Sequence, residues 1–510
     1  MATSPPPADL RPVDLPEQLP EQLRVRREKR AALLAAGTEP YPVTVARTHR
    51  LGEVRADHAD LPPDSATGAV VSVTGRVTFA RNSGKLCFAT LTDGEGATLQ
   101  VMLGLAGVGA ERLADWKSQV DLGDLVGVTG EVITSRRGEL SVLASGWELA
   151  SKALRPPPNP HAPLSEESRA RRRHADLLVS PRARELARLR PRAVAAIREF
   201  FTDRDFVEVE TPVLQTLQGG ATARPYETRS NALDIQLYLR IALELYLKRA
   251  VVGGLERVFE IGRVFRNEGV DATHSPEFTM LEAYQAWGDY DSMAHLTRDL
   301  VTTVARRATG DTVLSVGSHE VDLAGPWHDV TLFSALSAAV GVDVGPDTPR
   351  DVLLSLADRH VIAVDSSWGD GKLALELFEH LCERDLVQPT FVRDYPLEVR
   401  PLTREHRSDP RLAESWDLYV GGVELATAYS ELADPVVQRE RLEAQVALAA
   451  GGDAEAMPLD EDFLEALEYG MPPTGGLGMG VDRLVSFLAG GPVRDVLLFP
   501  LVRPAPAATG

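Results

Sequence analysis

The stretch Arg263–Trp287, RVFRNEGVDATHSPEFTMLEAYQAW, decides the fold and the chemistry of the larger part of this chain. A strand ends near Arg266, a polar loop follows, and a second strand returns over EFTMLEAY. A hairpin of this kind would present Arg266, Glu268, His274 and Phe278 near one another. Arginine offers a rigid fork of donors that suits phosphate oxygens, and Phe278 offers a flat apolar face for a base. The alternative is a surface hairpin with incidental charges.

The returning strand and two neighbouring stretches predict a site for a cation. Glu282 and Tyr284 are two residues apart, so their side chains share one face of the strand. A carboxylate beside a phenol suits an ammonium ligand. Upstream, RIALELYLKRAVVGG (240–254) predicts a helix that paired glycines end, with Glu244 near its start. Before it, the tight turn LQGGA (217–221) could expose backbone carbonyls to a ligand.

Two later stretches complete the expected site. GGLGMGVDRLVSFLAG (475–490) has glycines that let the backbone approach a ligand closely, followed by Arg483 as a second candidate phosphate clamp. By itself this pattern is typical of many strand-to-helix turns. WDLYVGGVELATAYSELADP (416–435) places Asp417, Glu424 and Glu431 on strand-like segments, where a core strand with edge charges is the alternative. Mg²⁺ binds through a few carboxylates plus phosphates. Together these stretches predict a site for ATP and a cationic small molecule.

The remainder of the chain predicts an α+β protein with several domains. A chain of 510 residues favours two or three domains. Between about residues 70 and 149, five short strands with a helix before the fourth favour an oligonucleotide-binding (OB) type of β-barrel, although other small barrels share this pattern. Neither a P-loop nor a G-x-G-x-x-G turn is present, which disfavours a doubly wound nucleotide fold. The expected parts are a disordered tail (1–20), a basic helix plus barrel (21–150), a Pro-rich and basic linker (151–180) and a catalytic domain (181–505).

The charge and the apolar pattern suggest where the protein works. The net charge of −20 argues, taken alone, against nucleic-acid binding. The basic residues are bunched, however: five fall within residues 24–30 and four within 169–173, and these two runs flank the small β domain. Binding depends on local fields, so the two runs favour a polyanionic partner. The sequence lacks an apolar run of membrane-spanning length and an apolar signal core, and it has 2 cysteines, which predicts a cytoplasmic protein.

These motifs, in this order, resemble a known family. FVEVETPVL, FRNEG…HSPEFTMLEAYQAW and GGLGMGVDRLV resemble motifs 1, 2 and 3 of the class II aminoacyl-tRNA synthetases. LYLRIALELYLKR, GGATARP, ELATAYSELADP and DEDFLEALEYGMPPTGGLG are similar to lysine–tRNA ligases in particular. The resemblance runs from about Arg24 to Pro504. It implies an N-terminal five-stranded anticodon-binding barrel, a catalytic antiparallel sheet flanked by helices, and a homodimer through motif 1, which includes Pro212.

The reaction that the resemblance implies has two steps. L-lysine is activated with ATP and Mg²⁺ to lysyl-adenylate with release of pyrophosphate, and the lysine is then transferred to the 3′ end of tRNA(Lys). Arg266 would contact the α-phosphate and the lysine carboxylate, and Glu268 would read the adenine amino group. His274 would approach the γ-phosphate. Phe278 would stack on adenine, while Arg483 would clamp its other face and the γ-phosphate. Arg266, Glu268 and Arg483 are thus the expected catalytic residues.

The resemblance also implies the remaining sites. The amino-acid site would use Gly219, Glu244 and Glu282 around the α-ammonium, Tyr284, Tyr429 and Glu431 around the ε-ammonium, and Thr427 near the carboxylate. The metal ligands would be Asp417 and Glu424, and the anticodon-reading residues would be Phe88, Gln100 and Glu139. An aromatic side chain in such a barrel can stack on a single-stranded base. A buried ammonium requires a paired carboxylate, for which Glu431 is the candidate.

The sequence departs from the family pattern at several of these positions. Thr427 stands where most lysine enzymes have Asn, Leu243 replaces a usual Pro, Asp417 a usual Glu and Ala433 a usual Asn. Several of these departures are similar to the synthetase half of bifunctional proteins that make lysyl-phosphatidylglycerol. This chain carries no lysyltransferase module, so we expect it at most to supply lysyl-tRNA to such a pathway.

Three other functions are disfavoured by particular residues. An enzyme that passes the adenylate to a protein lysine or a small amine would lack the barrel that carries Phe88. Aspartate or asparagine specificity would require a cation in the pocket, whereas Glu244, Glu282 and Glu431 favour a cationic substrate. A tRNA-binding paralogue without catalysis would have lost residues such as Arg266.

Overall fold

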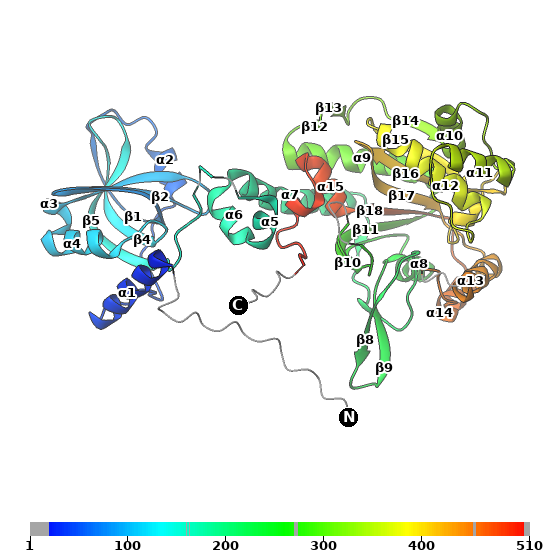
Figure 1. Ribbon diagram of the computed structural model, residues 1–510, viewed down its shortest axis with the longest axis horizontal. Coiled ribbons are helices and arrows are strands. Elements are labelled where there is room, and N and C mark those ends of the chain that lie inside the picture. Colours follow the sequence, from blue (N-terminus) through cyan, green and yellow to red (C-terminus); the bar gives the residue numbers. More distant parts are fainter. Residues whose placement is uncertain (1–19, 160, 163, 270–273, 452–454, 504–510) are drawn as a thin grey trace. The chain divides into compact units, whose positions relative to one another are not determined.

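The computed structural model describes residues 20–159, 161–162, 164–269, 274–451 and 455–503. The tail that the sequence predicts to be disordered therefore lies outside the described residues, apart from Pro20. The chain forms two compact units, Met1–Arg184 and Glu185–Gly510 (Figure 1).

The N-terminal unit is built around a closed five-stranded barrel. Its strands are β1 (Ala66–Ser83), β2 (Leu86–Thr92), β3 (Thr98–Gly104), β4 (Leu125–Thr134) and β5 (Leu140–Ser151), joined in the order β1-β2-β3-β5-β4. Side chains of β2 and β3 alternate between a buried inner face and an outer face, as the strand period of two requires. The helix before the fourth strand is α4 (Ala110–Gln119). The predicted OB-type barrel is therefore confirmed.

The other helices of this unit are α1 (Glu21–Ala35), α2 (Leu51–Asp57), α3 (Leu105–Val108), α5 (Glu166–Arg171) and α6 (Arg173–Val179). The basic helix α1 is fixed to the barrel by Arg26, which donates 2.8 Å hydrogen bonds to the carbonyl oxygens of Leu122 and Ala153. A fully buried lysine lies close by: Lys152 Nζ is 2.6 Å from Asp121 Oδ2 and 2.7 Å from Asp124 Oδ2.

The C-terminal unit is built on an eight-stranded sheet in the order β14-β15-β16-β17-β18-β11-β10-β6. Neighbouring strands are antiparallel except for the pairs β14/β15 and β10/β6. The strands are β6 (Val207–Glu208), β10 (Arg257–Phe265), β11 (Glu277–Ala286), β14 (His328–Thr331), β15 (Thr390–Pro396), β16 (Leu412–Val420), β17 (Val423–Ser430) and β18 (Thr474–Gly480). The predicted antiparallel sheet flanked by helices is confirmed, and it belongs to an α+β fold.

Helices α7 (Pro181–Thr202), α9 (Tyr290–Thr309) and α15 (Val481–Ala489) pack on one face of the sheet and share its main apolar core with Phe259, Leu281 and Trp416. Because side chains alternate along β11, Leu281 and Ala283 point into this core while Glu282 and Tyr284 point to the opposite face. The opposite face of the sheet therefore carries the polar groups.

Helices α8 (Glu244–Val252), α13 (Pro435–Ala450) and α14 (Glu461–Glu468) form a second apolar cluster around Tyr284. The helix predicted from residue 240 begins only at Glu244. Arg240 instead forms a buried ion pair with Glu260, 2.7 Å from Nη1 to Oε1, which ties the preceding strand to β10.

An inserted group of helices, α10 (Leu332–Val340), α11 (Arg350–Arg359) and α12 (Asp370–Leu381), has an apolar core of its own. The smaller elements are β7 (Leu214–Gln215), β8 (Tyr226–Ser230), β9 (Ile235–Leu239), β12 (Val313–Val316), β13 (His319–Asp322), α16 (Val493–Val496) and the 3₁₀ turns Glu383–Asp385 and Leu397–Val399. Within the described parts of the chain, no helix combines the length and the apolarity needed to cross a bilayer.

Candidate active site

The glycine-rich strand β18 lies between β11 and β17 and brings three distant segments together. The strand register places Glu282 opposite Gly478, Gly478 opposite Thr427, and Thr427 opposite Asp417. Four residues from four strands therefore form one row across the sheet. In the next row, Tyr284, Gly476 and Tyr429 follow one another in the same way.

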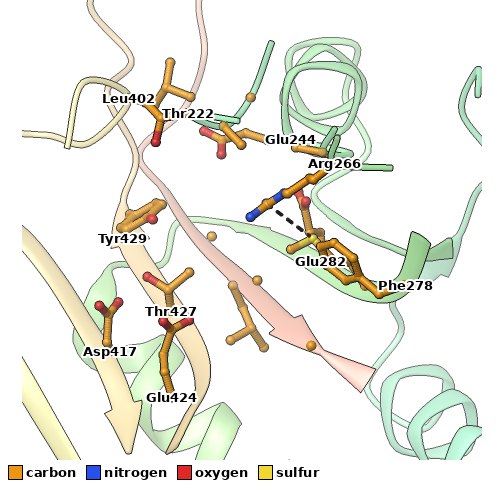
Figure 2. Close-up of a pocket in the computed structure, with 18 of the residues that line it drawn as sticks. Thr222, Glu244, Arg266, Phe278, Glu282, Leu402, Asp417, Glu424, Thr427 and Tyr429 are labelled. Carbon is orange, nitrogen blue, oxygen red and sulfur yellow. Dashed lines mark hydrogen bonds between the residues drawn. The ribbon is translucent and has the colours of Figure 1, made fainter. Parts of the chain in front are cut away.

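A pocket of about 340 Å³ opens over these rows. Figure 2 shows Arg266, Glu282 and Phe278 on one side of it, and Asp417, Glu424, Thr427 and Tyr429 on the facing side. The predicted residues that line it are Glu244, Arg266, Glu268, His274, Phe278, Glu282, Tyr284, Asp417, Glu424, Thr427, Tyr429, Glu431 and Arg483. Gly219 is not among the lining residues, whereas its neighbour Gly220 is.

The floor of the pocket depends on Gly476. A Cβ atom at this position would collide with Glu431 Oε1 and lie 2.7 Å from Tyr284 Cε1. Glycine therefore allows the carboxylate of Glu431 to lie flat against the strand, in a place that any other residue would fill. Glycine at position 476 is therefore required by the protein's own packing, in addition to any close approach of a ligand.

One end of the pocket combines arginines with an aromatic ring. The guanidinium carbon of Arg266 lies 5.3 Å from the centroid of the Phe278 ring, and Arg266 Nη2 lies 4.0 Å from Met280 Sδ (Figure 2). Arg483 Nη1 donates to the backbone oxygen of Glu424 at 3.0 Å. Burial lowers the pKa of Arg266, while nearby carboxylates, Glu268 first among them, oppose that shift. A flat apolar face beside two forked cations is suited to a purine and its phosphates.

The other end is anionic. Glu244, Glu282 and Glu431 are all buried. Glu282 accepts hydrogen bonds from the backbone N–H of Leu243 at 3.0 Å and from the Tyr284 hydroxyl at 3.1 Å. Burial raises the pKa of Glu282 to about 8 and also raises the pKa of Glu431. Burial penalises the charged form of both groups, so a cation bound beside them would favour their ionised form.

A protein ammonium group, which the sequence analysis missed, lies among these carboxylates. Lys248 Nζ is 2.7 Å from Glu244 Oε1 and 3.2 Å from the Leu402 carbonyl oxygen, and it forms an ion pair with Glu431 Oε2. The two carboxylates overcome desolvation and raise the pKa of Lys248. The signal that could have found it is the helical spacing: Lys248 follows Glu244 by four residues within the predicted helix, so both face the same side.

Arg400 was also missed, and no local pattern marks it. It follows the short turn Leu397–Val399, far from the recognised motifs. Its Nη2 lies 2.5 Å from Asp417 Oδ2, and its Nη1 donates to the Tyr429 hydroxyl at 3.4 Å. The other oxygen, Asp417 Oδ1, is buried and has no hydrogen-bond partner among the described residues. One oxygen of Asp417 is therefore held by an arginine, and the other remains available to a second cation.

Of the three barrel residues, Phe88 and Gln100 lie on the paired strands β2 and β3, and Glu139 directly precedes β5. Cys87, Ala89, Leu99 and Val101 fill the barrel interior, so Phe88 and Gln100 point outward. Gln100 pairs with Thr90, two residues beyond Phe88, and its Oε1 accepts a 2.9 Å hydrogen bond from Ser141. Glu139 is exposed just before β5. One outer surface of the barrel thus offers an aromatic ring next to polar groups.

Two families of known domains match this chain. Residues 165–503 match the tRNA synthetases of class II (D, K and N), and residues 71–150 match the OB-fold nucleic acid binding domain. Lysine--tRNA ligases of Mycobacterium bovis and Mycolicibacterium gilvum are both 57% identical to it, over 96% of this chain and 99% and 98% of theirs. The lysylphosphatidylglycerol biosynthesis bifunctional protein LysX of Mycolicibacterium vanbaalenii is 50% identical over 98% of this chain and 45% of its own length.

Proposed function

This chain belongs to the class II lysine–tRNA ligases, and on that premise we propose which of its groups carry out the two steps of the reaction. Such an enzyme joins lysine to the α-phosphate of ATP, releases pyrophosphate, and transfers the lysine to the 3′ end of a tRNA. The observation that carries the assignment of roles is a single pocket with paired arginines and an aromatic ring at one end and three buried carboxylates at the other.

ATP occupies the end with the arginines. Adenine lies between Phe278 and Arg483, with Glu268 at its amino group. Arg266 binds the α-phosphate and the lysine carboxylate, and His274 lies toward the γ-phosphate. In the first step a carboxylate oxygen of lysine attacks the α-phosphorus, and the bond to pyrophosphate breaks. No protein nucleophile is needed, because positioning and fixed positive charge stabilise the transition state.

Lysine extends toward the carboxylates. Its α-ammonium group lies near Glu244 and Glu282, beside the turn of Gly219 and Gly220. Its ε-ammonium group lies between Tyr284, Tyr429 and Glu431, and Thr427 lies next to the reacting carboxylate. The oxygen Glu431 Oε1 supports this assignment, because it is buried and accepts no hydrogen bond from any residue that the structure describes. An anionic oxygen without a donor indicates a ligand that supplies one.

Two carboxylates that line the pocket, those of Asp417 and Glu424, would hold Mg²⁺. Asp417 Oδ1 and the carboxylate of Glu424 would hold it together with phosphate oxygens, while Arg400 keeps Asp417 in place through its other oxygen. When bound, Mg²⁺ neutralises part of the phosphate charge and orients the phosphates. Arg483 lies 3.4 Å from Glu424 Oε1 and so holds this second carboxylate.

The outward face of the barrel binds the anticodon of tRNA(Lys), and we expect its main contact to be a base stacked on Phe88. Replacing Phe88 with alanine raises the KM for tRNA roughly tenfold, because a base–aromatic stack contributes about 1–3 kcal/mol. Aminoacylation of a lysine tRNA transcript measures this change. Lysine-dependent ATP–pyrophosphate exchange stays unchanged, as does charging by the control Val70→Ala on the same barrel. An unchanged KM for tRNA would remove Phe88 from the anticodon site.

The segment that resembles motif 1 forms a homodimer contact. Val207, Val213 and Leu214 are large apolar side chains of this segment that stay exposed in the single chain, as does Leu217 just after it. A group of exposed large apolar side chains is typical of a protein interface. Sedimentation of the full chain is expected to give a mass of two chains, and a single-chain mass at micromolar concentration would contradict the dimer.

The pH dependence of stability tests the anionic end. Burial raises the pKa of Glu282 from 4.5 to about 8, so between these pH values the folded enzyme keeps a proton that the unfolded chain has lost. The stability that this proton contributes is lost as the pH rises to about 8, and the free enzyme becomes less stable. Bound lysine favours the ionised form of Glu282, whose neighbouring titratable groups are Glu244, Tyr284 and Arg266. The increase in Tm caused by saturating lysine should therefore be larger at about pH 8.5 than at about pH 6.5. An equal increase would contradict the assignment, and Glu282→Gln should reduce the difference.

The overall function is tested by ATP–pyrophosphate exchange measured with each amino acid, followed by charging of a lysine tRNA transcript in cytoplasmic ionic conditions. Exchange should depend on lysine, and charging should depend on the anticodon. Exchange with aspartate or asparagine instead of lysine would contradict the assignment. Exchange without transfer to tRNA would point to another acceptor for the adenylate.

A further inference from the structure

The buried ammonium group of Lys248 lies behind the proposed amino-acid site and does not line the pocket. It is completely buried, on helix α8, behind the carboxylates that line the pocket. An ammonium group has three N–H donors. Three acceptors lie around this one: Glu244 Oε1, the Leu402 carbonyl oxygen and Glu431 Oε2. With every donor used, Lys248 has none left for a substrate, and it holds both carboxylates in fixed positions.

The charges at this end of the pocket can be counted. Three buried carboxylates, Glu244, Glu282 and Glu431, line this end of the pocket, and one buried ammonium group, that of Lys248, contacts Glu244 and Glu431. With all three carboxylates ionised, as a bound cation would favour, these four groups carry a formal sum of two negative charges. L-lysine brings two ammonium groups, one at each end of its carbon chain, and its own carboxylate is directed toward Arg266. The substrate therefore supplies the number of positive charges that the pocket lacks.

Resting on the pocket roles proposed above, we propose that Lys248 is a specificity-determining residue. Its fixed ammonium group neutralises one of three carboxylates and leaves the pocket two positive charges short, so that only a diamino acid completes it. An amino acid with a neutral side chain leaves one buried carboxylate uncompensated. Without Lys248, three like charges would share one buried site, where they cannot all be ionised.

This proposal predicts that the effect of one substitution changes sign with its background. In the wild-type enzyme, Lys248→Met removes the cation that holds Glu431, so the buried carboxylates bind protons more tightly. A proton on a carboxylate competes with the substrate's ammonium group, and the KM for lysine rises about tenfold, the factor that corresponds to one pKa unit. In a Glu244→Gln enzyme two carboxylates remain, Glu282 and Glu431, and Lys248 neutralises one of them. The pocket then needs only one more positive charge. There, Lys248→Met restores the deficit of two, so it improves selection of lysine.

The measurement is the ratio of kcat/KM for L-lysine to kcat/KM for the isosteric analogue that carries a hydroxyl in place of the ε-amine, determined by ATP–pyrophosphate exchange. We expect Glu244→Gln to lower this ratio about tenfold. The double variant Glu244→Gln/Lys248→Met should have a higher ratio than Glu244→Gln. It should recover at least about a third of the tenfold decrease, measured on a logarithmic scale. A double variant with a ratio equal to or below that of Glu244→Gln would overturn the proposal. A residue that only supports packing would give that result, since its loss harms every background.

The barrel offers a matched control. Lys152 is also fully buried between two carboxylates, Asp121 and Asp124, but it lies in the other unit. Lys152→Met should lower stability without changing the ratio. If Lys248→Met alone fails to fold, the comparison of Glu244→Gln with the double variant still decides the question, because these two enzymes differ from each other only at residue 248. Absence of lysine-dependent exchange in the wild-type enzyme would instead contradict the proposed function, which separates the two failures.

Discussion

Replacing Arg266 with alanine should abolish lysine-dependent ATP–pyrophosphate exchange, with kcat/KM falling by roughly 10³-fold or more. Arg266 lies in the pocket where the arginine end meets the carboxylate end, and its guanidinium group stands 5.3 Å from the Phe278 ring. From there it can contact the α-phosphate and the attacking carboxylate together. Negative charge on the phosphate shifts during the attack, so a preorganised cation stabilises the transition state more than the ground state.

The matched control is Arg263→Ala. Arg263 lies three residues earlier in the same hairpin and is exposed, outside the pocket. Its loss should change the exchange rate less than twofold, a span within the usual effect of a surface substitution. Exchange by Arg266→Ala at more than about a tenth of the wild-type rate would show that the phosphate is stabilised by other groups.

Replacing Glu431 with glutamine should raise the KM for lysine roughly 10²-fold while the KM for ATP changes little, because truncating one partner of a buried charge pair costs about 2–5 kcal/mol. Glutamine preserves the size of the side chain, so the glycine floor at Gly476 still accommodates it. The substitution removes only the negative charge that binds the ε-ammonium group of lysine. Exchange kinetics at varied lysine and at varied ATP separate the two constants.

An exposed glutamate on α13 serves as the control for this variant: Glu440→Gln should leave both constants unchanged. A result in which Glu431→Gln raised the KM for ATP as much as the KM for lysine would indicate general damage to the pocket. A KM for lysine within twofold of the wild-type value would place the ε-ammonium group elsewhere.

Much of this architecture could be predicted because local patterns carry it. The alternation along β11 places Glu282 and Tyr284 on one face, and the barrel strands follow from short apolar runs between turns. The hairpin of Arg266 and the glycine-rich strand are continuous sequence motifs. Their joint order identified the family, which the matches over residues 71–150 and 165–503 confirm. Features of this kind depend on neighbours in sequence, which a single sequence displays.

What could not be predicted depends on contacts between distant segments. The cross-strand row from Glu282 to Asp417 requires the register of four strands. Arg400 reaches Asp417 from a turn without a pattern. Lys248 was within a predicted helix, but only the fold brings Glu431 from a separate strand to its ammonium group. The sequence therefore indicates an anionic pocket, whereas the role of Lys248, the cation that sets the net charge of the pocket, is seen only in the fold.

The central claim is that one pocket holds a protonated side-chain amine at its carboxylate end and a nucleotide at its arginine end. A crystal structure with L-lysine and a non-hydrolysable ATP analogue tests it directly. The account predicts the ε-amine within hydrogen-bonding distance of Glu431 and Tyr284, with adenine between Phe278 and Arg483. An amine bound away from Glu431, or a nucleotide outside the Phe278–Arg483 gap, would contradict it.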